Sequence, residues 1–394
     1  MRQSRPLRNV ICLWICLAGA PVAIAAEEAA RVAANDKEEM TPDWVQLPLS
    51  VSKETLKRVF AVPPIETAED FTFSVLVPPR TQLYDPFDIH VVDHQTVWVT
   101  DDAKSGAIFK VMQDGHVSVL AEIKKHPPIS LDVAPPSFGK FAGQIYTVAF
   151  AKAEKAGGWE LPDAITRIDP ATGGDTVICF LPENDAHEPG GGGFFARFGP
   201  ENGPFAGKLW VTTASNHTLY QVTPDGVCKP FVTIDLAKWG SPRGIGFTPD
   251  GKTMLLGSAA PAADNRAKTT PGGGRILRVS PDGTVAAQPF VGGLHEPGAM
   301  AFAPKSFGRF AGELFISDAG DWNNEVEATE PVPSDGRVYR VTPEGKLVLV
   351  ASGFRNPVGV AFLGDLLMIS DINGDFHIGS QKFADGFIVT IKVR

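Results

Sequence analysis

The sequence predicts an all-β protein, a six-bladed β-propeller in which four-stranded antiparallel sheets surround a central channel. Three observations predict this fold. The chain has 40 glycines and 33 prolines among 394 residues, so turns are frequent and long helices are not expected. One pattern of short β segments, separated by Gly- and Pro-rich turns, recurs six times. A further β segment, residues 71–77, precedes the first complete copy.

The first 25 residues are typical of a signal peptide. They begin with a basic stretch, continue through apolar residues 10–20 and end in the small-x-small sequence Ala23-Ile24-Ala25. We expect cleavage after Ala25 and a periplasmic or secreted protein, with no membrane span after cleavage. The alternative is an uncleaved anchor, because the apolar stretch just reaches the length of a span.

Residues 26–70 form a polar, acidic extension that is expected to act as a tether or wrapping arm, and the propeller is expected over residues 71–394. The formal net charge of −9 and the pI of about 5.4 argue against a nucleic-acid partner. A small neutral or cationic ligand, or a metal ion, fits this charge better.

The fifth copy shows the repeat most clearly, with strands expected at residues 297–302, 314–318, 336–341 and 346–351. The other copies begin near Pro86, Pro128, Pro189, Pro242 and Pro357. The sixth copy offers only three strands before the chain ends. We therefore expect residues 71–77 to pair with residues 386–392, because this pairing closes the ring and leaves no bare sheet edge.

Cys179 and Cys228 are the two cysteines that remain after cleavage. An oxidising compartment favours their pairing. The repeat layout, however, places them near the outer strands of neighbouring blades. We expect their Cα atoms to lie farther apart than the ~7 Å limit of a disulfide, with pairing as the alternative.

Strand direction places the starts of the first strands and the ends of the second strands on one face of the ring. Long loops follow the second strand in three blades, at residues 152–162, 259–273 and 319–335, and they carry Trp159 and Trp322. Exposed indoles suit stacking on a sugar or another flat ligand, although the rings could instead plug the blades. The opposite face carries a repeated segment, residues 134–143 and 303–312, which is expected to be scaffold.

Oxygen-bearing side chains gather at the same predicted face, and a ring of such oxygens suits a divalent cation, with Ca²⁺ as the best match. The candidate metal ligands are Glu188, Glu296, Asn356, Asp318 and Asp371. The alternative is that these residues cap turns through hydrogen bonds to the backbone.

Two His-Glu-Pro-Gly segments place His187 and His295 beside acids, so both are candidate general bases, with solvent-facing or core histidines as the alternative. Arg243 and Arg355, at the starts of the fourth and sixth copies, are candidate ligand-binding residues together with the two tryptophans. The predicted ligand is a small molecule such as a sugar or a lactone.

The repeats resemble the six-bladed NHL and SMP-30/gluconolactonase propellers of the TolB-like superfamily. The resemblance covers residues 71–394 and rests on starts such as Pro-x-Gly-x-Ala-Phe and on second strands such as Leu314-Phe315-Ile316-Ser317-Asp318. For the lactonase branch it implies a channel cation that activates water or polarises a lactone carbonyl. Glu296, Asn356 and Asp318 match the residue types of its ligands, and Asp318 thereby joins the catalytic candidates.

A second, local resemblance concerns residues 353–362, which are similar to the Arg-Asn-Pro segment of soluble PQQ-dependent sugar dehydrogenases. It implies that Arg355 and Asn356 hold the quinone and that His187 takes a proton from the sugar. A third class is a non-catalytic binding scaffold, because many functions use this fold. Cofactor absorbance and metal dependence distinguish the three.

Overall fold

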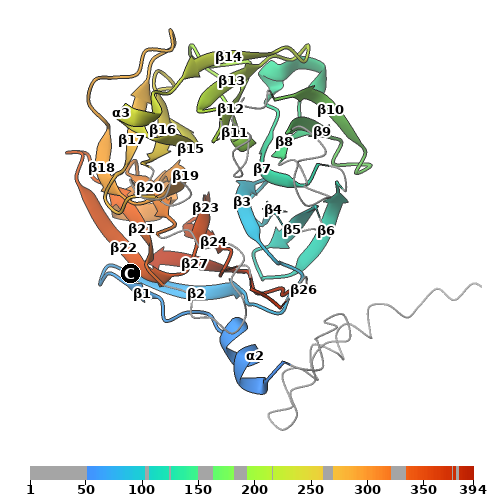
Figure 1. Ribbon diagram of the computed structural model, residues 1–394, viewed down its shortest axis with the longest axis vertical. Coiled ribbons are helices and arrows are strands. Elements are labelled where there is room, and N and C mark those ends of the chain that lie inside the picture. The colour runs from blue at the N-terminus through green and yellow to red at the C-terminus, as the bar shows by residue number, and fades with distance from the viewer. Residues whose placement is uncertain are drawn as a thin grey trace, which may run out of the picture. The chain divides into compact units, whose positions relative to one another are not determined.

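The computed structural model describes residues 51–102, 106–123, 126–149, 163–181, 193–214, 216–260, 269–320, 334–374, 376–378 and 381–394. Six antiparallel sheets are arranged around a ring, which confirms the predicted fold class (Figure 1). The predicted signal peptide and residues 26–50 lie outside the described residues. Among the helices of the described part, none has the length and apolar character needed to cross a bilayer.

The first three blades follow the predicted order. Blade 1 comprises β3 (Pro86–Val91), β4 (Thr96–Asp101), β5 (Ala107–Met112) and β6 (Val117–Glu122). Blade 2 comprises β7 (Pro128–Val133), β8 (Ile145–Ala149), β9 (Ala164–Ile168) and β10 (Asp175–Phe180). Blade 3 comprises β11 (Gly193–Phe198), β12 (Leu209–Thr213), β13 (Thr218–Val222) and β14 (Cys228–Thr233). The start expected near Pro189 lies outside the described residues.

Of the other three blades, the last two incorporate the N-terminal strands β1 and β2. Blade 4 comprises β15 (Ser241–Phe247), β16 (Met254–Ala259), β17 (Gly274–Val279) and β18 (Val291–Leu294). Blade 5 comprises β19 (Pro297–Phe302), β20 (Leu314–Asp318), β21 (Gly336–Val341) and β22 (Leu347–Phe354), with β1 (Glu66–Thr67) at its edge. Blade 6 comprises β23 (Pro357–Leu363), β24 (Leu366–Asp371), β27 (Phe387–Val393) and β2 (Phe71–Val77).

Burial decreases from the centre of the ring outward. Every residue of β8 and β12, both second strands, is buried, whereas the outer strand β10 has only exposed and half-buried residues. Inner strands have neighbouring blades on both faces, so their side chains are apolar or hydrogen-bonded rather than alternating.

Second-strand hydroxyls connect neighbouring blades near the channel. Thr100 Oγ1 donates to the Ile129 carbonyl at 2.8 Å, and Ser317 Oγ donates to the Val358 carbonyl at 2.6 Å. Ser370 Oγ donates to the Phe87 carbonyl at 2.8 Å and so links blade 6 to blade 1. Each bond pairs a buried carbonyl that the strand ladder leaves free, which avoids the cost of an unsatisfied polar group.

The pairing predicted for residues 71–77 is present in the structure. Phe71 lies opposite Val393 and Val77 lies opposite Ile388, so β2 is the outer strand of blade 6. The effect of this pairing on stability stays a prediction.

The segment before β2 packs on the propeller. Helix α2 (Lys53–Val59) begins at Ser52, whose hydroxyl accepts the Thr55 amide at 3.0 Å. Further along, β1 pairs with β22 through Glu66 and Ser352. Gly353 has φ +89°, and a Cβ at this position would meet the Pro64 carbonyl oxygen at 2.4 Å, so the arm can approach β22 only because this residue is glycine.

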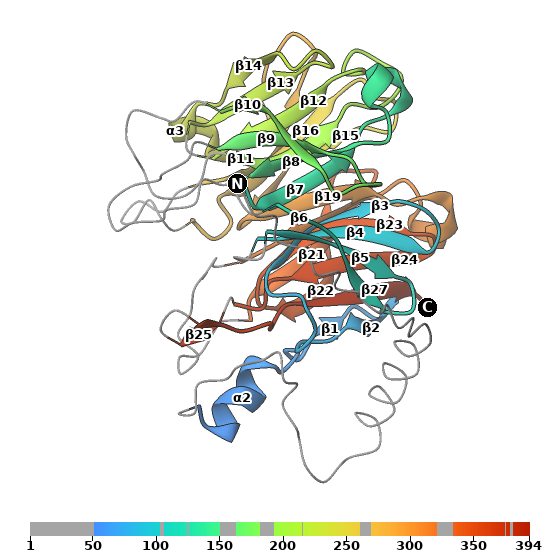
Figure 2. The same cartoon turned by 90° about the vertical axis from the view of Figure 1, so that its right-hand side faces the viewer.

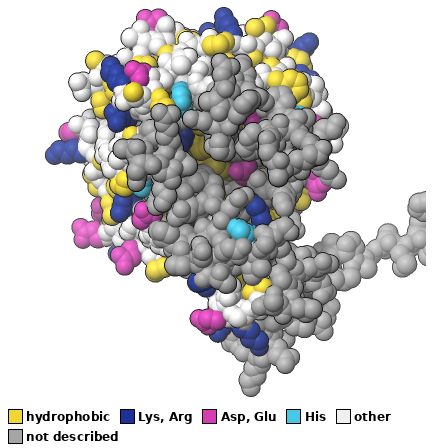
Figure 3. Space-filling view, in the orientation of Figure 1, with side chains coloured by type: hydrophobic (Ala, Val, Ile, Leu, Met, Phe, Trp, Pro, Cys, Tyr) yellow, Lys and Arg dark blue, Asp and Glu magenta, His cyan; other side chains and the backbone are white. Residues whose placement is uncertain are grey.

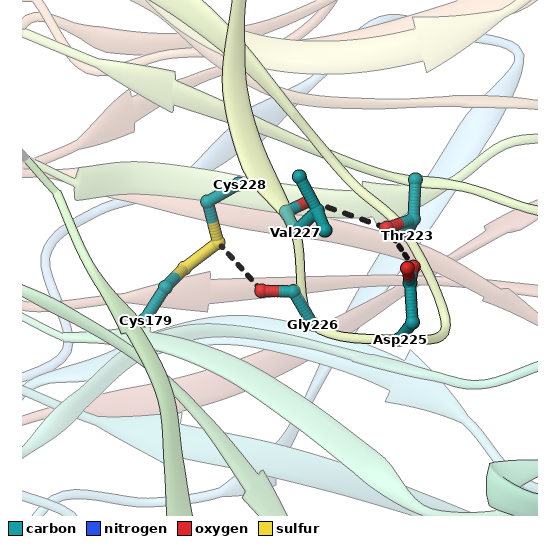
Figure 4. Close-up of a disulfide and its surroundings, with 6 residues drawn as sticks. All are labelled: Cys179, Thr223, Asp225, Gly226, Val227 and Cys228. Carbon is teal, nitrogen blue, oxygen red and sulfur yellow. Dashed lines mark hydrogen bonds between the residues drawn. A yellow bond between two sulfur atoms is a disulfide. The ribbon is translucent and has the colours of Figure 1, made fainter.

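The prediction that Cys179 and Cys228 are too far apart for a disulfide is wrong. They lie on the outer strands β10 and β14 of adjacent blades, as expected, but their Cα atoms are 6.4 Å apart and the sulfurs are bonded (Figure 4). The outer edges of blades 2 and 3 approach within disulfide distance here, which a position on neighbouring outer strands does not by itself exclude. The turn that precedes Cys228, residues 223–227, is closed by the hydroxyl of Thr223, which bonds Asp225 and the Val227 carbonyl.

Candidate ligand-binding site

The start face is defined here as the side of the ring where the first strands begin. It lies on the left in Figure 2, with α3 (Leu236–Trp239) and β25 (His377–Ile378), and it faces the viewer in Figures 1 and 3. In Figure 3, hydrophobic, acidic and basic side chains are visible at its centre. His187, Glu188, Trp159 and Trp322 lie outside the described residues, so their predicted roles stay predictions.

Arg243 and Glu296 form an ion pair on this face between blades 4 and 5. Arg243 Nε donates to Glu296 Oε1 at 2.8 Å, and the two side chains are only 14% and 6% exposed. Arg243 Nη1 also donates to Ser241 Oγ at 2.9 Å, and its guanidinium carbon lies 5.0 Å from the centroid of the Phe194 ring. These contacts hold the guanidinium in one orientation, which a flexible surface arginine does not have.

His295 lies beside this pair and is held in one tautomer. Its Nε2 is 3.2 Å from the carbonyl oxygen of Thr269. A carbonyl can only accept, so Nε2 donates this hydrogen bond, and in the neutral ring Nδ1 is then the nitrogen that has the lone pair. The Thr269 hydroxyl donates to Glu296 Oε2 at 3.2 Å. Thr269 belongs to the long loop after β16, so this loop contributes to the site.

Asp318 and Asp371 make the contacts of turn caps. Asp318 accepts the amides of His295 and Glu296, at 3.0 and 2.6 Å. Asp371 accepts the amides of Arg355 and Asn356, both at 3.0 Å. Asp101 repeats the contact in blade 1, where it accepts the Tyr84 amide. Each carboxylate therefore positions the residues that lead into the first strand of its own blade, which is the alternative that the sequence left open.

Burial shifts the pKa values of the two capping carboxyls, Asp318 and Asp371. It raises the pKa of Asp371 to about 6, against the opposing effect of the amide hydrogen bonds and of Arg355. It also raises the pKa of Asp318. Desolvation is the larger effect because both carboxyls lie among buried strands, where the charged form loses its hydration.

A second cluster forms at blade 6 around Arg355, which is 9% exposed. Its Nη1 donates to Asn373 Oδ1 at 2.5 Å, and the Phe376 ring lies 5.3 Å away. Sequence reasoning missed Asn373. Its signal is the position two residues after a capping Asp, in the loop that follows β24 and contains β25 and β26 (Gln381–Lys382).

Three of the predicted calcium ligands already form hydrogen bonds within the protein. Glu296 is bonded to Arg243 and Thr269, and Asp318 and Asp371 are bonded to amides. Within the described part of the chain, no group of three or more His, Cys, Asp or Glu side chains is arranged to hold a metal. Ca²⁺ takes six to eight oxygen ligands, and Glu188 lies outside the described residues, so the calcium site stays a prediction.

The channel wall carries a further polar network that sequence reasoning missed. Arg197 on β11 forms two bonds of 2.6 Å to Asp88 on β3, and Ser130 on β7 donates to the same carboxylate. Closer to the opposite face, His90 Nδ1 lies 2.8 Å from Asp132. Burial alone would raise the pKa of Asp132, but His90 and Arg197 hold it below its usual range. The pattern was visible as polar residues at the third and fifth positions of β3 and β7 and at the fifth position of β11.

No family profile matches the chain, and no curated protein matches it in sequence. Solved structures do match. The PQQ-bound aldose sugar dehydrogenase of Streptomyces coelicolor aligns with a TM-score of 0.55 at 13% identity, covering 84% of this chain and 100% of its own. A gluconolactonase of Xanthomonas campestris aligns with a TM-score of 0.53 at 15% identity, covering 85% and 96%. At these identities the likeness shows that the chain shares the six-bladed propeller fold.

Proposed function

We propose that this protein binds a small polyhydroxylated molecule, a sugar derivative or its lactone, on the start face of the channel. The observation that carries the proposal is the buried Arg243–Glu296 pair with His295 fixed beside it. One cation, one anion and one imidazole of defined tautomer are presented together on the face that also carries the long loops. Such convergent polar groups in a mostly apolar setting are typical of ligand sites.

The reaction that this geometry supports best is lactone hydrolysis. The guanidinium of Arg243 can stabilise negative charge on the carbonyl oxygen as water attacks. Nδ1 of His295 has the lone pair that a general base needs to accept a proton from that water. The fold is also that of a gluconolactonase, which supports this choice as an analogy only.

The test uses D-gluconate as a binding probe and D-glucono-1,5-lactone as a substrate. We expect Arg243→Ala to weaken gluconate binding by roughly 10–100-fold, the loss of one charge-assisted hydrogen bond. The matched control is Arg340→Ala. Arg340 pairs with Glu313 at 2.5 Å on the opposite face, with similar side-chain exposures of 15% and 11%. Equal losses in both variants, or no binding of either probe by the parent, would contradict the proposal.

A quinone-dependent sugar dehydrogenase is the second candidate. It is favoured by Arg355, a buried guanidinium over the Phe376 ring in an Arg-Asn-Pro segment, because a planar guanidinium pairs well with a carboxylated cofactor. Adding PQQ and glucose with a dye acceptor distinguishes the candidates. Dye reduction supports the dehydrogenase, whereas lactone hydrolysis without PQQ supports the hydrolase. If neither activity appears and gluconate still binds, the scaffold alternative holds.

The proposal has two further parts, calcium binding at Glu296 and export of the protein from the cytoplasm. Glu296 is bonded to Arg243, so a calcium ion at Glu296 would compete with this pair, and added Ca²⁺ that raises the melting temperature of the EDTA-treated protein would support calcium binding. Export to the periplasm or the medium is supported by the Cys179–Cys228 disulfide, since such bonds persist in oxidising compartments.

A further inference from the structure

The last turn of α2 and Phe60 rest on the start face of blade 6, and residues 53–60 are called the strap here. Val59 is fully buried, and its carbonyl accepts Asn373 Nδ2 at 3.2 Å. The Phe60 ring packs edge-on against Phe383 with centroids 5.8 Å apart, and the Arg80 guanidinium carbon lies 4.7 Å from the Phe60 centroid. A segment that precedes all the repeats is thus fixed to the loop after β24.

Asn373 connects the strap to Arg355. Its Nδ2 donates to the carbonyls of Val59 and Asp385, and its Oδ1 accepts Arg355 Nη1. The backbone of Asn373 has φ +68°, a conformation that Asn tolerates, and its amide donates to Asp371 at 2.6 Å. The side-chain amide is therefore held at both ends, and a displacement of Val59 reaches Arg355 through one residue.

The Arg355 guanidinium is almost fully buried, but one of its N–H groups can still donate a hydrogen bond to a ligand. Its Nε, although buried, has no hydrogen-bond acceptor within the part of the chain that the structure describes. Burial lowers the pKa of Arg355, Asp371 and Asp385 oppose that effect, and Arg58 on the strap adds a like charge. A docked strap thus brings a second positive charge toward a desolvated one, which a carboxylate would relieve.

We propose that the strap controls access to Arg355, so that the guanidinium is covered when residues 53–60 are docked and becomes available to a carboxylate-bearing ligand when they are released. This inference rests on the proposed function, because it specifies the chemical class of the ligand that binds the start face and how access to that face is controlled. Asn373 is the positioning residue that transmits the docking.

Phenylglyoxal, which modifies accessible arginines, tests the proposal without any ligand. The modification rate of Arg355 is followed by mass spectrometry in the parent, in Phe60→Ala and in Asn373→Ala. We expect about a fivefold rise in both variants, the scale of losing one aromatic contact or one hydrogen bond. Arg243 and Arg340 in the same samples are internal references, and their rates should not change.

The matched control is Phe141→Ala. The ring of Phe141 lies under the guanidinium of Arg167 at 3.9 Å on the opposite face, so the same truncation there should leave the Arg355 rate unchanged. Equal Arg355 rates in the parent and both variants would overturn the proposal. A parallel rise at Arg243 and Arg340 would also overturn it, because it would indicate general loosening. Failure of gluconate binding would refute the proposed function and leave these rates unaffected.

Discussion

At the scale of single residues, Asp carboxylates that accept backbone amides position the residues of the start face. Asp101, Asp318 and Asp371 each end a second strand and accept amides that precede the first strand of the same blade. This contact holds Glu296 and Asn356 at the beginning of their strands, so a side chain of the candidate site is positioned by a carboxylate that need not touch a ligand.

The raised pKa of Asp371 gives a prediction about pH. An unfolded Asp titrates near 3.8, whereas the pKa of Asp371 in the folded protein is about 6. The folded state therefore binds this proton more tightly. Its contribution to stability is present below about pH 3.8 and is lost as the pH rises through about 6, with a size on the order of 3 kcal/mol.

Asp371→Asn removes this titration and keeps an amide-accepting oxygen. Urea unfolding between pH 4 and 7 should show that the parent loses free energy of unfolding relative to Asp371→Asn as the pH rises. Asp250→Asn is the control, because turn hydrogen bonds lower the pKa of this exposed acid and the trend is absent. A parent-to-variant difference that is independent of pH would refute the raised pKa.

Sequence patterns located the acids but could not assign their partners. Asp318 was predicted to be both catalytic and a metal ligand because an acid at a strand end suits either role. Whether its oxygens face amides or the channel depends on the backbone of the following residues, which has no signature in residue types. Arg243 and Glu296 are 53 residues apart, so their pairing requires knowledge of how blades 4 and 5 meet.

At the scale of elements, the disulfide between β10 and β14 joins two blades along their outer edges. Inner strands of neighbouring blades are already packed against one another, whereas outer strands diverge. A covalent link at the outer edge therefore restrains the part of the interface with the least apolar contact.

We expect reduction of this disulfide to lower the free energy of unfolding by roughly 2–4 kcal/mol, because it closes a loop of 49 residues. Urea unfolding of the mature chain with and without dithiothreitol measures the effect, and Cys179→Ser/Cys228→Ser should match the reduced parent. If reduction left the unfolding midpoint unchanged, the link would not restrain the unfolded chain as this account requires.

Strands that are bounded by clear Gly- and Pro-containing turns were predicted well, including those of the copies that begin at Pro86, Pro297 and Pro357. The repeated segments between first and second strands form the same 3₁₀ turns, η1 (Pro136–Phe141) and η2 (Lys305–Phe310), with Gly139 and Gly308 at φ +69° and +70°. The loop after β24 was not predicted as part of the site, because its strands β25 and β26 have two residues each and are too short to show an alternating pattern.

At the scale of the whole molecule, the ring is asymmetric around its channel. The first strands of blades 1 to 3 carry Asp88, Ser130 and Arg197, whereas blades 5 and 6 place Ala299 and Gly359 at positions equivalent to Asp88. Polar and charged side chains at these positions thus link blades 1 to 3, whereas small residues allow close packing at the equivalent positions of blades 5 and 6. A Cβ on Gly359, for example, would meet the Phe87 carbonyl oxygen of blade 1 at 2.7 Å.

Ring closure by β2 should dominate the stability of this assembly. A chain that begins at residue 78 lacks the outer strand of blade 6 and leaves β27 with a bare edge, so it should lose most of its stability. A chain that begins at residue 69 keeps β2 and is the control. Similar melting temperatures for the two chains would refute this role of the closure.

The central claim is that the start face binds the ligand, and a crystal soaked in D-gluconate tests it most directly. The account predicts density for gluconate beside Arg243, Glu296 and His295. The opposite face offers the η1 and η2 turns, whose Phe138 and Phe307 are buried. Gluconate bound among these turns, with the Arg243 pair unoccupied, would contradict the account.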